Sequence, residues 1–588
     1  MIVVSELSLD LMGQKLLGHF SGRLPSLGHS SLADWSLRLN SDDIGELATA
    51  FGLDWIYPEH GELNVQVRPS ANRDYDFQLQ AGLLANGVNL NISGDMTGFD
   101  DNAGFNLMYL INASAFSEND KIFWDGLSRI GSFRLDGSLI RVKGAREPTT
   151  VWLSLNSNKL GVLIAEGSIF SMNSMGSRLD LSIATDSISK FMSVASVRMA
   201  NVRPFQGDAT VRLTNGSLLL DDFHFRVGNN DLFGDIEYRR GVITGTRPAI
   251  KANVESTYLN LNELFPPPKK MFLFSEEPLP AGWAISHDVS VQFKVGRFLR
   301  RNYDLRELVG GVTSLSGVVD AHSRSSAFGG DLELTLILDT RATPFKAVYQ
   351  YNWNDLDLAL LPVARKAAPE ITGRVDLKGG ITGEGRSLHQ IVERGDGYLF
   401  VDVEQARFLR GGMELFTTSP INIVEQILRE VSPWGQREKF FDIECGVIGL
   451  RIKNGVGVAL PPPEHTIAIK AKEFRLAGFG DLQLSDESLS LSVRSKARGL
   501  GFSSATLIEQ SGLSAIYPPF YRIAGSLLSP KVESDPEGSD LVETLLKLGS
   551  AYVTGGTSVA LLGLIDRLAI EPVGCEGARD RALKLVPK

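Results

Sequence analysis

Hydrophobic and polar residues alternate along most of this chain, and such alternation is typical of β-strands with one apolar and one polar face. Gly, Asn and Asp separate the alternating runs, as hairpin turns require. The pattern therefore predicts a mainly β protein built from antiparallel hairpins. The clearest runs are DWSLRLNS (34–41), RLDLSIAT (178–185), FKAVYQYNW (345–353) and TIAIKAK (466–472).

The segment FRLAGFGDLQLSDESLSLSVRSK (474–496) predicts a meander of three short strands. A glycine-containing break follows the first strand, and SDES separates the second from the third. Gly478 and Gly480 are candidates for a register shift between the first strand and the rest. We expect one face of this meander to line an apolar interior. The candidate residues, with two from the preceding run, are Phe474, Leu476, Leu482, Leu484, Leu489, Leu491, Val493, Ile467 and Ile469.

Two further patterns recur at or within the predicted strands. Four strands are followed by an Asp or Asn and then by apolar residues at helical spacing, which predicts short helices capped by the Asx side chain. A glycine–aspartate step also recurs, and glycine inside a strand suggests a bulge or a tight turn. The predicted helical segments are 41–51, 185–195, 257–265 and 353–362, and the glycine steps are SGDM (93–96), FGDI (233–236), FGGDL (328–332) and FGDL (479–482).

The chain divides at a proline-rich segment, and its longer helices lie towards the C-terminus. SPINIVEQILREVSP (419–433) has a Ser cap, Pro at the first helical position and a closing Pro. A second amphipathic helical segment begins near Asp540 and is interrupted by Gly555-Gly556. We therefore expect an N-terminal β region, a linker, a C-terminal β region, a helical segment and a tail. Their predicted bounds are 1–264, 265–283, 284–538, 539–574 and 575–588.

So much one-sided sheet requires a cover for its apolar face. Each Val, Leu or Ile side chain left exposed forfeits about 1.5–3 kcal/mol, and dozens of them would outweigh the stability of a domain. A second sheet, closure into a barrel, or curling into a trough that holds an apolar ligand would each provide the cover. Sandwiches would show regular linkers, and a membrane barrel would show strands with aromatic girdles. The sparse linkers favour an elongated, curved antiparallel trough with a few short helices.

Composition and charge exclude several classes of protein. The chain has 588 residues, 43% of them hydrophobic, which is ordinary for a globular protein. Its formal net charge of −10 argues against nucleic-acid binding, which needs a basic surface. No run of 18 purely apolar residues occurs, and no secretory signal stands at the start of the chain.

The sequence contains no recognisable catalytic or metal-binding pattern. Its eight histidines are scattered and form no HExxH motif, so we expect no metal site and no cofactor. Neither a GxSxG elbow nor a P-loop occurs, and GLGFSSA (499–505) lacks the third glycine of a nucleotide-binding loop. We therefore expect a protein that is not an enzyme.

The two cysteines, Cys445 and Cys575, allow two interpretations from the residues alone. They could be unrelated buried thiols, because free Cys behaves as a small hydrophobic residue. They could also form one disulfide in an oxidising compartment.

Three segments resemble the AsmA family of bacterial envelope proteins, in the wider group that includes TamB and YhdP. ITGRVDLKGGITGEGRSLHQIVERGDGYLFVDVEQARF (371–408) is similar to its pattern of strand, Gly-x-Gly-x-Ser, short helix and strand. FFDIECGVIGLRIKNGVG (440–457) is similar to its cysteine-bearing strand and the Asn-Gly that follows. RIAGSLLSPKVESDPEGSDLVETLL (522–546) resembles its closing signature, and the resemblance is weak before about residue 200.

The resemblance implies a curved sheet with an apolar groove in the periplasm of a Gram-negative envelope. Family members are implicated in moving phospholipid towards the outer membrane and in outer-membrane assembly, normally tethered by one N-terminal helix. That helix is missing here, so we expect a chain that has lost its anchor or a soluble version. Because Cys445 and Cys575 sit where family members carry cysteines, the resemblance also implies that they are bonded to each other.

Three functions remain as hypotheses. The first is a non-catalytic protein that binds or conducts phospholipid between the inner and outer membranes, with membrane components as partners and no nucleic acid. The second is a β-rich scaffold for outer-membrane protein assembly that binds no lipid. The third is a hydrolase with an unrecognised site. A continuous apolar groove would favour the first, a closed core the second, and a convergent buried polar cluster the third.

Overall fold

The structure is a computed structural model of the whole chain. It describes residues 7–11, 14–23, 34–42, 60–85, 87–98, 102–114, 130–144, 148–170, 176–194, 204–214, 216–241, 247–265, 274, 276, 278–279, 282–300, 303–360, 372–409, 440–460, 464–472, 474–497, 520–526, 529–534 and 574–586. The predicted helices at 419–433 and from Asp540 to about residue 568 lie outside these ranges, as does the predicted helical segment at 41–51 beyond residue 42.

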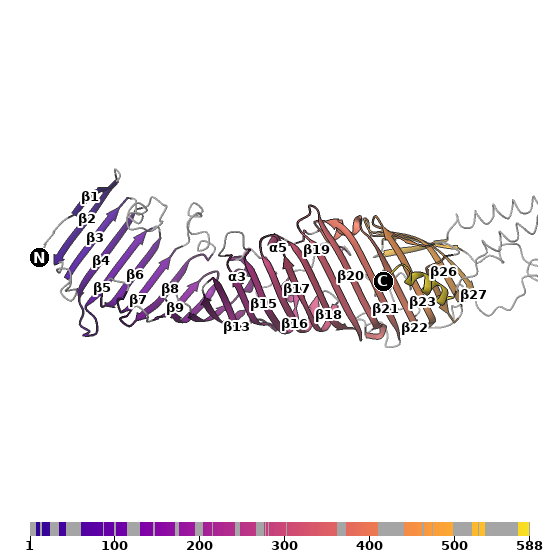
Figure 1. The fold of residues 1–588 in the computed structure, drawn as a ribbon, viewed down its shortest axis with the longest axis horizontal. Helices are drawn as coiled ribbons and strands as arrows, with labels where there is room; N and C mark the ends of the chain where they lie inside the picture. Colours follow the sequence, from indigo (N-terminus) through magenta and orange to yellow (C-terminus); the bar gives the residue numbers. More distant parts are fainter. Residues whose placement is uncertain are drawn as a thin grey trace, which may run out of the picture. The chain divides into compact units, whose positions relative to one another are not determined.

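The chain forms two compact units, Met1–Pro267 and Pro268–Lys588. The division falls inside the proline-rich segment at 265–283. Each unit is built on a curved antiparallel sheet whose strands succeed one another in chain order (Figure 1). The fold is mainly β, as the alternation predicts.

Unit 1 is one uninterrupted meander in which every strand pairs antiparallel with the next. Within the described ranges of this unit, two short helices accompany it, α3 (Ile188–Val194) and α4 (Leu261–Leu264). Its strands are β1 (Leu7–Leu11), β2 (Gln14–Arg23), β3 (Asp34–Ser41), β4 (Gly61–Pro69), β5 (Phe77–Ala85), β6 (Val88–Met96), β7 (Phe105–Ala113), β8 (Phe133–Arg141), β9 (Thr149–Ser157), β10 (Gly161–Ile169), β11 (Ser177–Thr185), β12 (Phe205–Thr214), β13 (Ser217–Val227), β14 (Asn230–Arg239) and β15 (Ala249–Asn260).

Unit 2 repeats the meander over its first strands and then becomes more elaborate. β24 and β25 both lie between β23 and β26, so one strand position is shared by two short strands. The strands are β16 (Asp288–Arg300), β17 (Tyr303–Leu315), β18 (Val318–Ala327), β19 (Gly330–Asp339), β20 (Phe345–Asp357), β21 (Thr372–Gly385), β22 (Asp396–Leu409), β23 (Phe440–Lys453), β24 (Val456–Ala459), β25 (Ile467–Ala471), β26 (Phe474–Gln483), β27 (Ser488–Ala497), β28 (Phe520–Ser526) and β29 (Ser529–Ser534), and the helices are α5 (Gly282–Ser286), η3 (Leu358–Leu360), α7 (Leu388–Glu393) and α12 (Cys575–Leu583).

The short helices agree in part with the predicted positions. α3 lies within 185–195, and α4 lies within 257–265. In α4 the Asn260 side chain accepts a hydrogen bond from the backbone N–H of Asn262, which is the predicted Asx cap. The prediction for 353–362 is wrong over most of the described part, because Trp353–Asp357 continues β20 and only η3 is helical. The first part of the expected tail at 575–588 forms the helix α12.

The four glycine–aspartate steps do not share one structure. Gly329 lies in the tight turn between β18 and β19, as predicted, with φ +80°. Gly94, Gly234 and Gly480 lie inside strands, at φ between +141° and +155°. A Cβ at any of these three would lie 2.0–2.2 Å from a carbonyl oxygen of the adjacent strand, so glycine is required for the strands to approach. The ladder is unbroken at Gly94 and Gly480, and only Gly234 faces a bulge, which lies in β13.

Candidate functional site

The apolar face of unit 1 is the largest candidate site in the described part of the chain. Cross-strand pairing aligns alternate residues of β3 to β12 into three adjacent rows, which we call the apolar strip. Its members are Trp35, Val67, Leu79, Gly94, Leu107, Leu139, Val151, Gly167, Leu179 and Val211; Leu37, Val65, Ala81, Ile92, Tyr109, Gly137, Leu153, Ala165, Leu181 and Ala209; and Leu39, Leu63, Leu83, Leu90, Ile111, Leu135, Leu155, Leu163, Ile183 and Gly207.

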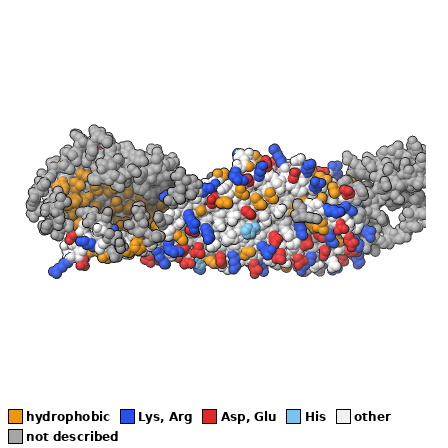
Figure 2. Space-filling model, in the orientation of Figure 1, with side chains coloured by type: hydrophobic (Ala, Val, Ile, Leu, Met, Phe, Trp, Pro, Cys, Tyr) orange, Lys and Arg blue, Asp and Glu red, His pale blue; other side chains and the backbone are white. Residues whose placement is uncertain are grey.

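The apolar strip carries no charged side chain, and most of its large side chains are half-buried. Strand spacing makes it roughly 40 Å long across the strands, and three alternate residues make it about 13 Å wide. Figure 2 shows hydrophobic side chains gathered in a hollow over the strands at the N-terminal end. Apolar patches of this extent on soluble proteins often mark binding sites.

The opposite face of the same strands carries charged and polar side chains, some of them paired, beside exposed hydrophobic ones such as Met108 and Trp152. The Arg38 guanidinium donates to the Asn64 side chain at 2.9 Å, and the Thr210 hydroxyl donates to Asp180 at 2.6 Å. The hydrogen bond from Thr210 is the largest cause that lowers the pKa of the Asp180 carboxyl. These groups are exposed, so their pairs add little stability. The apolar strip and the opposite face therefore differ in charge over β3 to β12.

One charged side chain, Arg141, lies on the apolar side at the end of β8, beyond the strip. Its guanidinium donates to the carbonyl oxygen of Ala103 at 2.6 and 2.8 Å and lies 4.8 Å from the centre of the Phe105 ring. The positive charge of Arg141 is thus stabilised by hydrogen bonds to a backbone oxygen and by a cation–π contact. Arg141 therefore marks an edge of the apolar face and does not interrupt it.

The residues predicted to line the interior at the C-terminal end lie in a closed core of unit 2. Seven of them are 1–9% exposed and belong to one hydrophobic cluster, to which Trp353 and Ile523 also belong: Ile467, Ile469, Leu476, Leu482, Leu484, Leu489 and Val493. Leu491 is half-buried and packs against that cluster. The side chain of Phe474 lies outside the described part of the structure. These residues of unit 2 therefore form a closed core, whereas the apolar strip of unit 1 is mostly half-buried.

The meander around these residues differs from the predicted one. Phe474–Gln483 is one continuous strand, β26, and its register with β27 runs without a shift. The expected break and register shift at Gly478 and Gly480 are therefore wrong. The two glycines lie directly opposite Val493 and Leu491 in the ladder, so they leave space on the apolar face for these larger side chains.

The face of β22, β23 and β25 opposite the large cluster is covered by α12, where Phe400, Val447 and Ala468 pack against the helix. Cys575 at its start is bonded to Cys445 of β23, with a Cα–Cα distance of 6.2 Å, so the implied disulfide is present. Ala578 and Ala582 are fully buried against the sheet, and a Cβ at Gly449 would lie 2.5 Å from the Cβ of Ala582. Small residues thus let the helix approach the sheet closely (Figure 1).

Two arginines of α12 complete this attachment. Arg579 forms an ion pair with Asp402 of β22, whose side chain is 12% exposed, and its Nη2 donates a hydrogen bond to that carboxylate at 2.8 Å. This hydrogen bond raises the pKa of Arg579. Arg581 donates from Nε to the backbone oxygen of His465 at 3.0 Å. His465 is 2% exposed, and within the described ranges neither of its ring nitrogens has a hydrogen-bond partner.

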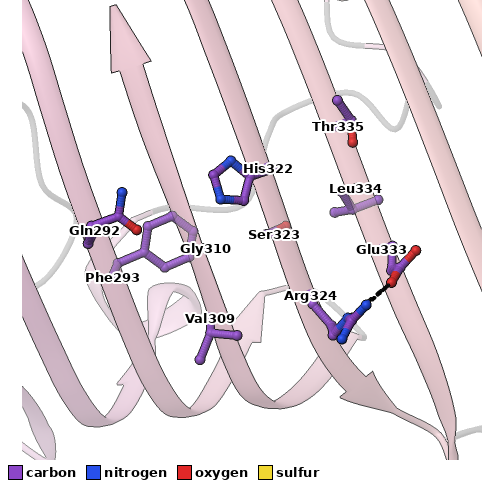
Figure 3. A pocket seen from close by; sticks show the side chains of 10 residues that line it. All are labelled: Gln292, Phe293, Val309, Gly310, His322, Ser323, Arg324, Glu333, Leu334 and Thr335. Carbon is purple, nitrogen blue, oxygen red and sulfur yellow. Dashed lines mark hydrogen bonds and ion pairs between the residues drawn. The ribbon is translucent and has the colours of Figure 1, made fainter.

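A hollow of about 500 Å³ lies on β16 to β19 in unit 2 (Figure 3). Its polar residues include an ion pair in which Arg324 Nε lies 3.0 Å from Glu333, with side chains 70% and 42% exposed. An exposed pair of this kind is a surface feature. His322, on the same hollow, is exposed and is not hydrogen-bonded to either residue, so the hollow offers no nucleophile–base pair in the described structure.

The described residues contain no group of three His, Cys, Asp or Glu side chains placed to hold a metal ion. Within the same ranges, no helix is long and apolar enough to cross a membrane. The chain matches no family model, no curated protein and no solved structure. The AsmA resemblance therefore stays a prediction.

Alternation in the sequence predicts the strands that carry the apolar strip, but it does not reveal the strip itself. RLDLSIAT and DWSLRLNS show which residues share a face within one strand. Their alignment with neighbours such as Leu153 and Ala209 depends on the registers, which the turns between strands determine.

Proposed function

We propose that this protein binds phospholipid, with the acyl chains on the apolar strip, and that it takes part in lipid movement and outer-membrane assembly in a bacterial envelope. The observation that carries the proposal is the uncharged, half-buried strip of unit 1. Hydrocarbon chains need no hydrogen-bond partners and gain about 0.8 kcal/mol for each buried CH₂ group. The envelope location rests on the AsmA resemblance and on the disulfide, which suits an oxidising compartment.

A protein partner fits the strip less well than a hydrocarbon chain. Protein interfaces combine an apolar centre with a polar rim and about one hydrogen bond per 100–200 Å². The three rows offer a single side-chain hydroxyl, that of Tyr109. The pKa of this hydroxyl is raised, mainly by burial and to a smaller extent by the nearby charge of Asp136. A surface with so few polar groups selects for an apolar ligand more than for a particular protein.

A second function, scaffolding without lipid, is favoured by one observation in unit 2. The cluster that contains Trp353, Leu476 and Val493 is closed and well packed. A closed core supports a rigid docking body, and it offers no space for a ligand chain. We therefore propose scaffolding only for this part of unit 2, and lipid binding for unit 1.

The proposal is tested by a pair of adjacent substitutions on β10. Leu163 lies on the apolar strip, whereas Ile164 points to the polar face and is 38% exposed. Leu163→Asp should weaken phospholipid binding at least tenfold, because a carboxylate on the strip must be desolvated against acyl chains, which costs more than about 1.4 kcal/mol. Ile164→Asp should leave binding within twofold of the unchanged protein.

Native mass spectrometry after gentle extraction shows whether the protein carries phospholipid. Titration with a fluorescent phospholipid then measures the affinity of the unchanged protein and of each variant. Circular dichroism checks that each variant is folded. If the unchanged protein carries and binds no phospholipid, the proposal is wrong. Equal binding by the two folded variants would place the lipid somewhere other than the strip.

A further inference from the structure

Aromatic residues on the apolar faces recur opposite glycines of the adjacent strand. Among the directly aligned pairs on the apolar faces of the described strands, four bring the aromatic ring or its hydroxyl over the glycine. Unit 1 contains Tyr109–Gly137 and Phe225–Gly207, and unit 2 contains Phe293–Gly310 and Tyr351–Gly379.

In each pair the ring lies over the glycine of its partner strand. A Cβ built at the glycine would be 2.3–2.6 Å from the nearest ring or hydroxyl atom of the aromatic side chain. Such a distance is far inside van der Waals contact, so any larger residue would force the ring to move. The rings thus occupy the space that the missing glycine side chains leave empty.

This arrangement determines how far the aromatic side chains project from the sheet. Side chains on strands normally stand roughly perpendicular to it, and an upright Phe or Tyr ring would extend well above neighbouring Ala or Val residues. Phe225 is half-buried and lies beside Ile183 and Gly207 at the end of the apolar strip. With the ring lying over Gly207, the surface stays level.

We infer that Gly207 determines how much acyl chain the apolar strip accepts, by letting Phe225 lie flat. This inference rests on the proposed lipid binding and adds a residue that sets its capacity. The ring contributes apolar surface without standing in the path of the chains. A larger residue at Gly207 raises the Phe225 ring into the space that a chain would occupy.

Filling a glycine gap with a ring also stabilises a sheet, and this effect alone would explain the pairs. The two interpretations differ in what they predict. A purely structural role predicts lower stability on substitution with unchanged lipid binding. A role in capacity predicts reduced binding that returns when the opposing ring is removed.

Gly207 and Gly379 are the suitable positions for the test. At both positions the three atoms nearest to an added Cβ belong to side chains and none to the backbone. The ring can therefore move while the ladder stays intact. Gly137 and Gly310 are unsuitable, because a Cβ there would also lie 2.4 or 2.3 Å from a backbone oxygen. Gly82 and Gly446 are matched controls in the two units, since a Cβ at these positions approaches no atom closer than 3.3 and 3.5 Å.

The experiment uses the full chain and a phospholipid with a fluorescent acyl chain. Gly207→Ala should reduce the amount bound at saturation at least threefold. Gly379→Ala, which displaces a ring of unit 2 outside the apolar strip, should leave the amount bound unchanged. The double variant Gly207→Ala/Phe225→Leu should return binding to within 1.5-fold of the unchanged protein. Gly82→Ala and Gly446→Ala should not change it.

Each outcome decides between the interpretations. A folded Gly207→Ala protein that binds as much lipid as the unchanged chain would overturn the inference while leaving lipid binding intact, and so would an equal loss of binding in Gly379→Ala. Failure of Phe225→Leu to restore binding would also overturn it, because the ring would not be the obstacle. If the unchanged protein binds no phospholipid, the proposed function fails and this inference fails with it.

Discussion

At the scale of single residues, His465 is the most unusual buried group of unit 2. It follows β24 and lies beneath α12, with Arg581 bonded to its backbone oxygen. Burial, and to a smaller extent the charge of Arg581, lowers the pKa of its imidazole from 6.5. A proton on this ring would place a second positive charge beside a guanidinium in a site almost without water.

This arrangement predicts acid sensitivity. Because the folded-state pKa of His465 is depressed, the unfolded chain takes up a proton below about pH 6.5 that the folded chain does not. The free energy of unfolding should therefore fall as the pH drops from 7.5 to 5.5. Urea unfolding should show a smaller fall in His465→Leu, whereas the exposed-site control His322→Gln should behave as the unchanged protein does. An equal fall in all three proteins would contradict the prediction.

At the scale of elements, α12 shows how a short helix can be held on a sheet. Its first residue is bonded covalently to β23, its small side chains allow close approach, and Arg579 pairs with Asp402. The disulfide joins residues 130 positions apart. In the chain-entropy model, closing a loop of that length stabilises the folded state by about 5 kcal/mol.

Removal of the disulfide should therefore loosen α12 and destabilise unit 2. The double variant Cys445→Ser/Cys575→Ser should unfold at a lower urea concentration, with a loss of about 2–5 kcal/mol. Amide hydrogen exchange in residues 575–583 should become faster. Dithiothreitol should reproduce the effect in the unchanged protein and have none in the double variant. Unchanged exchange in α12 after reduction would show that its non-covalent contacts suffice.

The sequence predicts individual elements better than their surroundings. Alternation identifies most strands, and the Asx signal at Asn260 identifies α4, because both depend on residues a few positions apart. The continuity of β26 through Gly478 and Gly480 was not predictable in this way, since it depends on close approach to β25 and β27. Nor could alternation distinguish the open strip around Leu163 from the closed core around Leu476, because both have the same local pattern.

At the scale of the whole molecule, the two units differ in how their apolar faces are covered. The large cluster of unit 2 contains buried residues from β17 to β28, whereas the strip of unit 1 is mostly half-buried. Cooperative opening of a region depends on the apolar contacts that hold it. The two units should therefore differ in local stability.

Hydrogen exchange can measure this difference directly. In the absence of lipid, the backbone amides of β23 to β27 should exchange at least tenfold more slowly than those of β4 to β9. Addition of phospholipid vesicles should slow exchange in β4 to β9 and leave β23 to β27 unchanged, because only the open strip gains a cover. Slowing in both regions, or in neither, would contradict the prediction.

The strand order of unit 1 bears on how the sheet could gain or lose hairpins. Each strand bonds only to the strands before and after it in the chain over β2 to β14. A duplicated or deleted hairpin would change the sheet by two strand spacings, about 10 Å, and leave every other pairing as it was. The span of the sheet is thus free to change in small steps through insertion or loss of hairpins, as it is in repeat proteins whose units contact only their neighbours.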